Sequence, residues 1–129
     1  MEPKRLKLDK DLLGGSAPYL VLSLLDHADR YGYEIIRELA VRSENVFELK
    51  EGTLYPILHK LESKGFLTSY TAQAPTGRER KYYHITKKGR MELEEERRQW
   101  LLFRHAVEKV TGALPAGGQP EGGGANALA

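Results

Sequence analysis

The chain has 129 residues, of which 40% are hydrophobic and 29% are charged, and it has no cysteine. These values suit one globular domain and exclude a disordered chain, a disulfide framework, a cysteine zinc site and a thiol nucleophile. No apolar run approaches the roughly 20 residues that span a bilayer. The start, MEPKRLKLDKDLL, lacks the apolar core of a signal peptide. We therefore expect a cytoplasmic protein.

The net charge of +2 is unevenly distributed along the chain. Residues 50–90 hold 9 Lys+Arg against 3 Asp+Glu, whereas residues 1–49 hold 7 against 9 and residues 91–129 hold 4 against 6. Positive charge concentrated in one segment attracts phosphate groups. A polyanion such as double-stranded DNA is the partner that this distribution indicates.

The first half of the chain predicts a basic terminus followed by two helices. Residues 1–10 are expected to be flexible, although an arm that touches DNA phosphates is an alternative. Residues 11–27 predict a buried helix whose regular part begins near Ser16, with Pro18 in its first turn. Residues 30–32 predict a turn and residues 33–41 a second, short helix. Residues 42–50 form a link that has room for one short strand.

Residues 51–65, EGTLYPILHKLESKG, predict a third helix with two different faces. Leu54, Leu58 and Leu61 recur at helical spacing and form its inner face. We expect the helix to begin near Thr53, because proline is tolerated in a first turn, and to stop at Gly65. The outer face is polar, basic and aromatic: Thr53, Tyr55, Pro56, His59, Lys60 and Lys64. A DNA-recognition helix is one interpretation, and an ordinary amphipathic surface helix is the other.

A β-hairpin is predicted directly after this helix. Residues 66–71 alternate as a strand with Phe66, Thr68 and Tyr70 on one side, and residues 80–85 form a second strand. A turn cluster that includes Gly77 joins them. The basic residues Arg78, Arg80 and Lys81 lie near the tip. A hairpin that follows a basic helix predicts a DNA-binding wing, the alternative being a solvated hairpin with a charged tip.

The last regular element is a long helix, capped by Thr86 and running to about Thr111. Lys87 and Lys88 stand in its first turn, where the helix dipole disfavours cations, and are expected to face DNA. A seam at heptad-like spacing follows: Leu93, Trp100, Phe103, Val107 and Val110. A compact core cannot cover so long a seam, so we expect a homodimer. Trp100 is either an anchor of that interface or a stacking wall for a flat aromatic effector.

The fold class is therefore mainly α with a small β-hairpin: a winged helix-turn-helix over residues 11–85 and a dimerisation helix over residues 86–111. Residues 112–129 are rich in Gly, Ala and Pro and are expected to be a disordered tail. The four histidines have no metal-ligand spacing, and no activated nucleophile is evident. We expect neither an enzyme nor a cofactor.

The segments YGYEI (31–35), EGTLYPILHKLESKGFL (51–67) and RERKYYHITKKGR (78–90) resemble the PadR family of bacterial transcriptional regulators. The resemblance covers about residues 12–111 and implies a dimeric repressor that binds an inverted repeat. One departure is Lys50, where family members often have a small hydroxyl residue.

Carried onto this chain, the resemblance implies a set of DNA-contacting residues. The major-groove residues would be Thr53, Tyr55, Pro56, His59 and Lys60, and the wing residues would be Arg78, Arg80, Lys81 and Tyr82. The alternative function is a winged helix that binds proteins rather than DNA. Salt dependence distinguishes the two, because phosphate contacts weaken steeply as salt rises.

Overall fold

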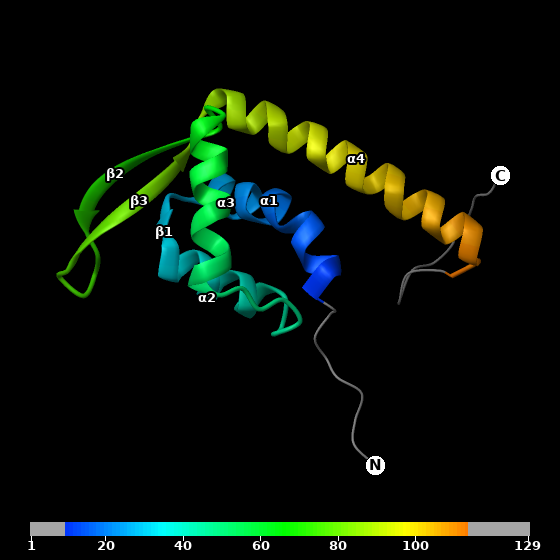
Figure 1. Ribbon diagram of the computed structural model, residues 1–129, viewed down its shortest axis with the longest axis horizontal. Coiled ribbons are helices and arrows are strands. Elements are labelled where there is room, and N and C mark those ends of the chain that lie inside the picture. Colours follow the sequence, from blue (N-terminus) through cyan, green and yellow to red (C-terminus); the bar gives the residue numbers. More distant parts are fainter. Residues whose placement is uncertain (1–9, 114–129) are drawn as a thin grey trace, which may run out of the picture. The chain divides into compact units, whose positions relative to one another are not determined.

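The computed structural model describes residues 10–113 of the chain. Of these, residues 10–97 belong to one compact unit and residues 98–113 to a second. The last helix crosses from the first unit into the second. In chain order the elements are α1 (Lys10–His27), β1 (Arg30–Tyr31), α2 (Gly32–Arg42), α3 (Glu51–Ser63), β2 (Leu67–Gln73), β3 (Glu79–Ile85) and α4 (Lys87–Thr111) (Figure 1).

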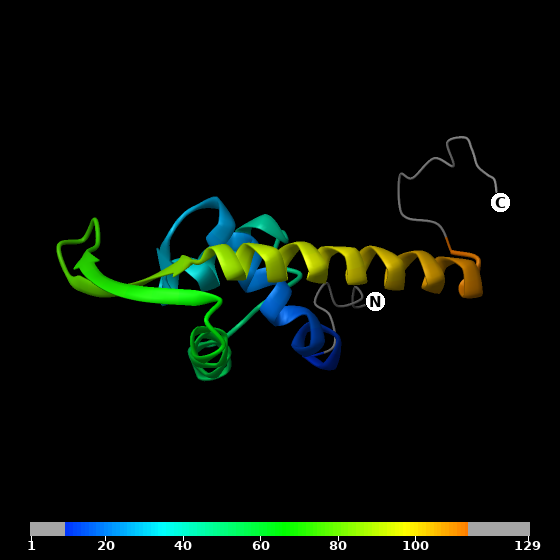
Figure 2. The same cartoon turned by 90° about the horizontal axis from the view of Figure 1, so that it is seen from above.

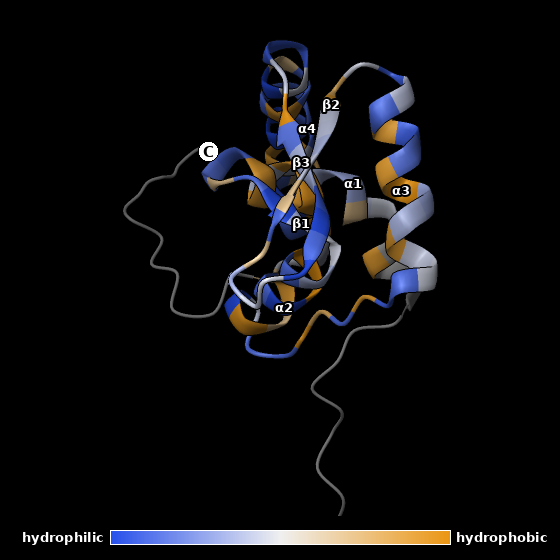
Figure 3. Cartoon of the chain, turned by 90° about the vertical axis from the view of Figure 1, so that its left-hand side faces the viewer, coloured by the Kyte–Doolittle hydropathy of each residue, from blue (hydrophilic) through white to orange (hydrophobic). Residues whose placement is uncertain are grey.

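One hydrophobic core fills the first unit, between its helices and the inner face of its small sheet. Coloured by hydropathy, α2 and α3 alternate apolar and polar residues along their length (Figure 3). Burying a valine, leucine or isoleucine side chain contributes about 1.5–3 kcal/mol to folding. The side chains that are at most 1% exposed are Ala17, Val21, Leu22, Leu25, Ile35, Leu54, Leu58, Tyr83, Ile85 and Leu93. The mainly helical fold with a small antiparallel sheet, predicted from the sequence, is confirmed.

The start of α1 differs from the prediction. The helix begins at Lys10 and passes through Pro18, so the expectation that its regular part begins near Ser16 was wrong. Ser16 instead donates its hydroxyl to the carbonyl oxygen of Leu13 at 3.2 Å, as a serine inside a helix does. A proline in a helix removes one backbone donor. Burial of Val21, Leu22 and Leu25 holds the helix together beyond that point.

The sheet has three strands in the order β1-β3-β2, one more than the predicted hairpin. The expected turn at residues 30–32 was wrong: Arg30 and Tyr31 pair with Tyr83 and Tyr82 of β3, and α2 begins at Gly32. No strand forms in the link between α2 and α3, at residues 43–50. Seen from above, the hairpin of β2 and β3 extends beyond the helices of its unit (Figure 2).

Strand β2 keeps Thr68 and Tyr70 on one face, as predicted, but it starts one residue later than the predicted strand. Strand β2 begins at Leu67, which is only 2% exposed and faces the core. Thr68 and Tyr70 lie on the opposite face and are exposed, while Phe66 precedes the strand. A strand places neighbouring side chains on opposite faces, so Leu67 alone sets which side is buried.

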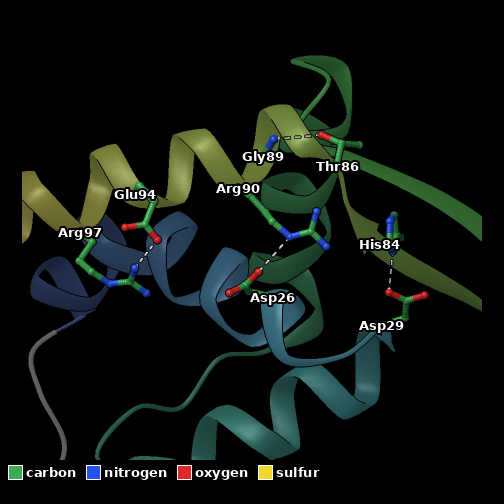
Figure 4. Close-up of polar contacts among 8 residues, drawn as sticks. All are labelled: Asp26, Asp29, His84, Thr86, Gly89, Arg90, Glu94 and Arg97. Carbon is green, nitrogen blue, oxygen red and sulfur yellow. Dashed lines mark hydrogen bonds and ion pairs between the residues drawn. The ribbon is translucent and has the colours of Figure 1, made fainter.

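Thr86 joins three elements where β3 gives way to α4. Its hydroxyl donates to the carbonyl oxygen of Gly65 at 2.7 Å and accepts from the backbone N–H of Gly89 at 3.0 Å (Figure 4). The predicted N-cap of the last helix is confirmed. Gly89 passes so close to the carbonyl oxygen of Phe66 that a Cβ would lie 2.2 Å from that atom. The first turn of α4 is therefore fixed to the turn that follows α3.

Candidate nucleic-acid interface

Helix α3 separates an apolar inner face from a polar outer face. Leu54 and Leu58 are fully buried and Leu61 is 6% exposed, as the leucine spacing predicts. The six residues predicted for the outer face are all exposed: Thr53, Tyr55, Pro56, His59, Lys60 and Lys64. The core thus holds the helix by one side and leaves the other side free for a partner.

Helix α3 starts two residues earlier than Thr53, so the predicted start near Thr53 was wrong. The helix begins at Glu51, with Lys50 as its N-cap. The carbonyl oxygen of Lys50 accepts from the N–H groups of Thr53 at 3.0 Å and Leu54 at 2.9 Å. A lysine side chain has no oxygen that can accept from a free N–H, and no side-chain cap forms here. Pro56 therefore stands inside the helix, beyond its first turn.

The end of α3 is as predicted. Gly65 has φ +84°, in the left-handed region that favours glycine. The N–H of Gly65 donates to Glu62 and that of Phe66 donates to Leu61, each at 3.0 Å. This pair of hydrogen bonds reverses the chain at once, so β2 starts beside the last turn of α3.

The hairpin places the predicted wing residues on one strand and at its tip. Strands β2 and β3 pair in register from Leu67–Ile85 to Gln73–Glu79. Gly77, with φ +92°, closes the turn by donating its N–H to Ala74 at 2.8 Å. Arg78 and Lys81 are exposed, whereas Arg80 is half-buried. The wing therefore presents cations beyond the helices of its unit.

A row of tyrosines crosses all three strands on the outer face of the sheet. Tyr31 and Tyr70 are the register partners of Tyr82 on either side. The ring of Tyr82 lies 5.3 Å from that of Tyr31, edge to face, and 5.7 Å from that of Tyr70, stacked. Such pairs contribute about 0.5–1.5 kcal/mol beyond burial. Tyr82, predicted as a wing contact, thus also stabilises the sheet.

A polar cluster around Asp29 ties the outer face of the sheet to the connection between α1 and β1. The hydroxyl of Tyr70 donates to Oδ2 of Asp29 at 2.6 Å. Figure 4 shows the second contact, in which Nδ1 of His84 lies 2.8 Å from Oδ1 of Asp29. Burial alone would raise the pKa of Asp29, but the hydrogen bonds from Tyr70 and His84 outweigh it and lower that pKa. The hydrogen bond to Asp29 is the main reason that the pKa of Tyr70 is raised to about 12. Nothing in the sequence pattern pointed to this cluster.

Lys87 and Lys88 occupy the first turn of α4, as expected, and both are exposed. The Nζ atom of Lys88 lies 5.6 Å from the ring centre of Phe66. Its side chain also lies within 3.6 Å of the place that a Cβ on Gly65 would occupy. Lys88 is therefore held beside the end of α3, which adds a cation to that end of the candidate interface.

The predicted dimer seam divides between the two units. Leu93 is 1% exposed in the core of the first unit, so it is not available to a partner, and including it in the interface was wrong. The first turns of α4 cover their own domain, which the seam pattern alone does not reveal. Within the second unit the other members are exposed: Trp100, Phe103, Val107 and Val110. The rings of Trp100 and Phe103 lie 6.1 Å apart.

A groove of about 450 Å³ lies between the start of α3, the start of α2 and the wing. Its lining includes Tyr31, Tyr33, Glu51, Tyr55, Arg80 and Lys81. Sequence reasoning missed Tyr31, Tyr33 and Glu51 as candidate site residues, because they stand outside the recognition-helix face and the wing. The available signals were the two motifs that carried part of the family resemblance: YGYEI contains Tyr31 and Tyr33, and EGTLYPILHKLESKGFL begins with Glu51.

Among residues 10–113, no group of three or more His, Cys, Asp or Glu side chains is arranged to hold a metal ion. None of the helices in that range is both long and apolar enough to cross a membrane.

The family model that matches the chain is that of the PadR-like transcriptional regulators, over residues 21–95. A transcriptional regulator of Mycobacterium tuberculosis, Rv3488, is 39% identical over 80 residues, which cover 60% of this chain and 71% of the relative. The negative transcriptional regulator PadR of Bacillus subtilis is 33% identical over 92 residues. That match covers 71% of this chain but only 48% of the relative, so the chain spans about half of that protein.

Solved structures agree with the family match. A transcriptional regulator from Clostridium thermocellum superimposes with a TM-score of 0.70 at 31% identity, covering 77% of this chain and 96% of that one. A PadR-like regulator from Bacillus cereus gives the same TM-score at 27% identity, covering 81% and 99%. The winged-helix geometry, the family model and these relatives agree. The chain belongs to the PadR family of transcriptional regulators, and it is a DNA-binding regulator rather than an enzyme.

Proposed function

We propose that the chain is a repressor that binds an inverted-repeat operator as a homodimer. The observation that carries the proposal is the outer face of α3, whose residues are all exposed while its leucines are buried in the core. Tyr55, His59 and Lys60 would read base edges in the major groove, where such side chains meet a distinct donor and acceptor pattern. The cations of the wing would bind neighbouring phosphates and fix the register of the protein on the duplex.

The proposed dimer joins two copies through the second half of α4. Trp100, Phe103, Val107 and Val110 are between 41% and 86% exposed, an apolar stripe that a second copy of the helix would cover. Leu101 and Leu102 are also more than half exposed. Pairing of the helices would set the separation of two recognition helices, for which half-sites about one helical turn, roughly 34 Å, apart are expected.

Trp100 acts in this proposal as an aromatic anchor of the interface. A flat aromatic effector would compete for the same ring face, which lies beside Phe103. Such a molecule releases the operator only if it binds one arrangement of the dimer better than the other. Release by an effector is therefore the part of the proposal that depends on dimerisation.

The test is an anisotropy titration of the full chain on its own upstream DNA and on a scrambled duplex, each at two salt concentrations. Tight binding to the upstream DNA alone, with two protomers per site and steep weakening by salt, is the expected result. Phe103→Glu should abolish the two-protomer complex, while Glu95→Gln on the same helix should preserve it. Weak, equal binding to both duplexes, together with a random pool that yields no tightly bound duplex, would contradict the proposal. That outcome would favour a winged helix that binds proteins.

A further inference from the structure

The groove between the wing and the two helices is lined by groups that donate hydrogen bonds at fixed positions. Its cations, Arg80 and Lys81, are adjacent in β3 and would ordinarily point to opposite faces of the strand. Both nevertheless line the groove. The guanidinium carbon of Arg80 lies 5.6 Å from the ring centre of Tyr31, and Nζ of Lys81 lies 5.6 Å from that of Tyr83. Cation–π contacts of this kind restrain both side chains before any ligand arrives.

Arg80 has an unused donor. Its Nε atom is buried and has no hydrogen-bond partner among the described residues. A buried donor without an acceptor is costly, by about 1–3 kcal/mol. A phosphate oxygen could accept from this donor only after a shift of the side chain, and arginine binds phosphates through paired donors.

The tyrosines on the other walls add hydroxyl donors. Tyr33 is 56% exposed at the start of α2, and Tyr55 comes from α3. A Cβ on Gly32 would lie only 2.3 Å from the hydroxyl oxygen of Tyr55. The ring of Tyr55 therefore rests on the first turn of α2. Tyr55 thus forms part of the groove wall, in addition to its proposed role in reading bases.

The groove also contains two carboxylates, Glu51 and Glu79, which balance the charges of Arg80 and Lys81. A site without net positive charge does not collect free anions from solution, because long-range attraction is absent. It does favour an anion that is delivered in the right place by other contacts. A duplex docked on α3 and the wing would deliver one in that way.

We propose that this groove seats one phosphodiester of the DNA backbone, bound by Arg80 and Lys81 with the hydroxyl of Tyr33, while the ring of Tyr31 holds the guanidinium of Arg80. The inference rests on the proposed function and adds Tyr33 to the DNA-contacting residues. The groove lies between the recognition helix and the wing. A phosphate bound there would fix the positions of both elements on the same DNA backbone.

The test uses the full chain and a duplex that it selects from a random pool, in which each phosphate is replaced in turn by a neutral methylphosphonate. Tyr33→Phe removes one hydroxyl from an exposed ring and should weaken binding to the unmodified duplex by about 3–10-fold. At one phosphate position, Tyr33→Phe and the methylphosphonate together should weaken binding no more than the methylphosphonate alone. At every other position the two fold-losses should multiply. Arg80→Ala should be coupled to the same position. Tyr19→Phe, a hydroxyl removed from α1 outside the groove, is the matched control and should bind like the wild type.

Losses that multiply at every position for both Tyr33→Phe and Arg80→Ala would overturn the inference while leaving the proposed function intact. Failure of the pool to yield any selected duplex would instead refute the proposed function and the phosphate seat with it. Inorganic phosphate provides a separate arm. If inorganic phosphate displaces DNA from the wild type at concentrations that leave DNA binding by Arg80→Ala unchanged, the groove is a free-anion site. That result would also overturn the inference.

Discussion

The hydroxyl of Tyr70 in β2 donates a 2.6 Å hydrogen bond to Asp29, which stands 41 residues earlier in the chain. His84 in β3 reaches the other oxygen of the same carboxylate at 2.8 Å. The side chain of Asp29 is about one-third exposed, so the contacts are partly screened by water. Their importance lies in what they join: both strands of the wing are attached to the segment that leads from α1 into β1.

Removing the Tyr70 hydroxyl should loosen this attachment without changing the core. Tyr70→Phe should lower the free energy of unfolding by about 0.5–1 kcal/mol, because the ring keeps its stacking on Tyr82 and loses only the hydrogen bond. Chemical denaturation measures the change. Asp26→Asn is the matched control, since Asp26 contacts Arg90 of α4 at 3.3 Å rather than the wing. A larger loss in the control than in Tyr70→Phe would contradict the importance assigned to the wing attachment.

The same contacts predict opposite pH effects at the two ends of the scale. The pKa of Asp29 is lowered in the fold. The stability that it contributes is therefore present above the pKa of an unfolded aspartate, about 3.9, and is lost as the pH falls through the folded value. The pKa of Tyr70 is raised to about 12. The stability that it contributes is therefore present below about pH 10, the pKa of an unfolded tyrosine, and is lost as the pH rises toward 12.

Phenolate absorbance during an alkaline titration measures the second effect directly. Burial also raises the pKa values of Tyr82 and Tyr83. The step near pH 12 that belongs to Tyr70 should disappear in Tyr70→Phe, while the steps of the other tyrosines remain. Acid denaturation measures the first effect, and Asp29→Asn should show a shallower loss of stability below about pH 4 than the wild type. Identical acid slopes in the two proteins would rule out a linked contribution from Asp29.

Lys50 offers a way to stabilise the recognition helix. It stands at the N-cap of α3 without a side-chain hydrogen bond. Lys50→Ser would supply an oxygen that accepts from a free N–H of the first turn, and we expect the free energy of unfolding to rise by about 1 kcal/mol. Lys50→Ala, which removes the same charge but adds no acceptor, separates capping from electrostatics. An equal gain in both variants would assign the effect to charge.

Gly89 should tolerate no side chain. A Cβ there would lie 2.2 Å from the carbonyl oxygen of Phe66, a backbone atom that cannot move aside easily. Gly89→Ala should cost about 3 kcal/mol, measured by thermal or chemical unfolding. Gly15→Ala is the natural comparison, because nothing lies within 4 Å of the added Cβ in α1. That change should stabilise the protein by about 0.5–1 kcal/mol through helix propensity.

The proposed division between base and phosphate contacts predicts different effects at Lys60 and Lys81. Lys60→Ala should weaken binding to a selected duplex by about 1–3 kcal/mol and leave binding to scrambled DNA much less affected. Lys81→Ala should weaken binding to both duplexes alike and lower the salt slope by about 1. Titrations on both duplexes at several salt concentrations measure these quantities. Equal losses at both positions on both duplexes would remove the distinction.

Sequence periodicity predicted those parts of the fold in which one face of an element is buried. Leu54, Leu58 and Leu61 identified the inner face of α3, and Gly65 its end, because the left-handed conformation of that residue is a local requirement. The start of α3 could not be found in the same way. Lys50 lacks the chemistry of a cap, so no local signal marks the boundary.

Other features depend on contacts between distant segments. Strand β1 has two residues, too few for an alternating pattern, and exists only because β3 pairs with it. Asp29 and His84 are 55 residues apart, so neither predicts the other. Leu93 has the spacing of the exposed seam, yet it is buried because the first turns of α4 cover the core. Tertiary packing, rather than local preference, decided each of these cases.

The hydroxyl of Thr86 has a consequence for the proposed dimer. It holds the carbonyl of Gly65, where the recognition helix has just ended, and the N–H of Gly89, where α4 has just begun. Two segments that share one hydroxyl cannot shift independently by more than a hydrogen bond allows. If two copies pair through α4 as proposed, a change in that pairing would act on the end of α3 through this contact, at a distance from the DNA-contacting surface.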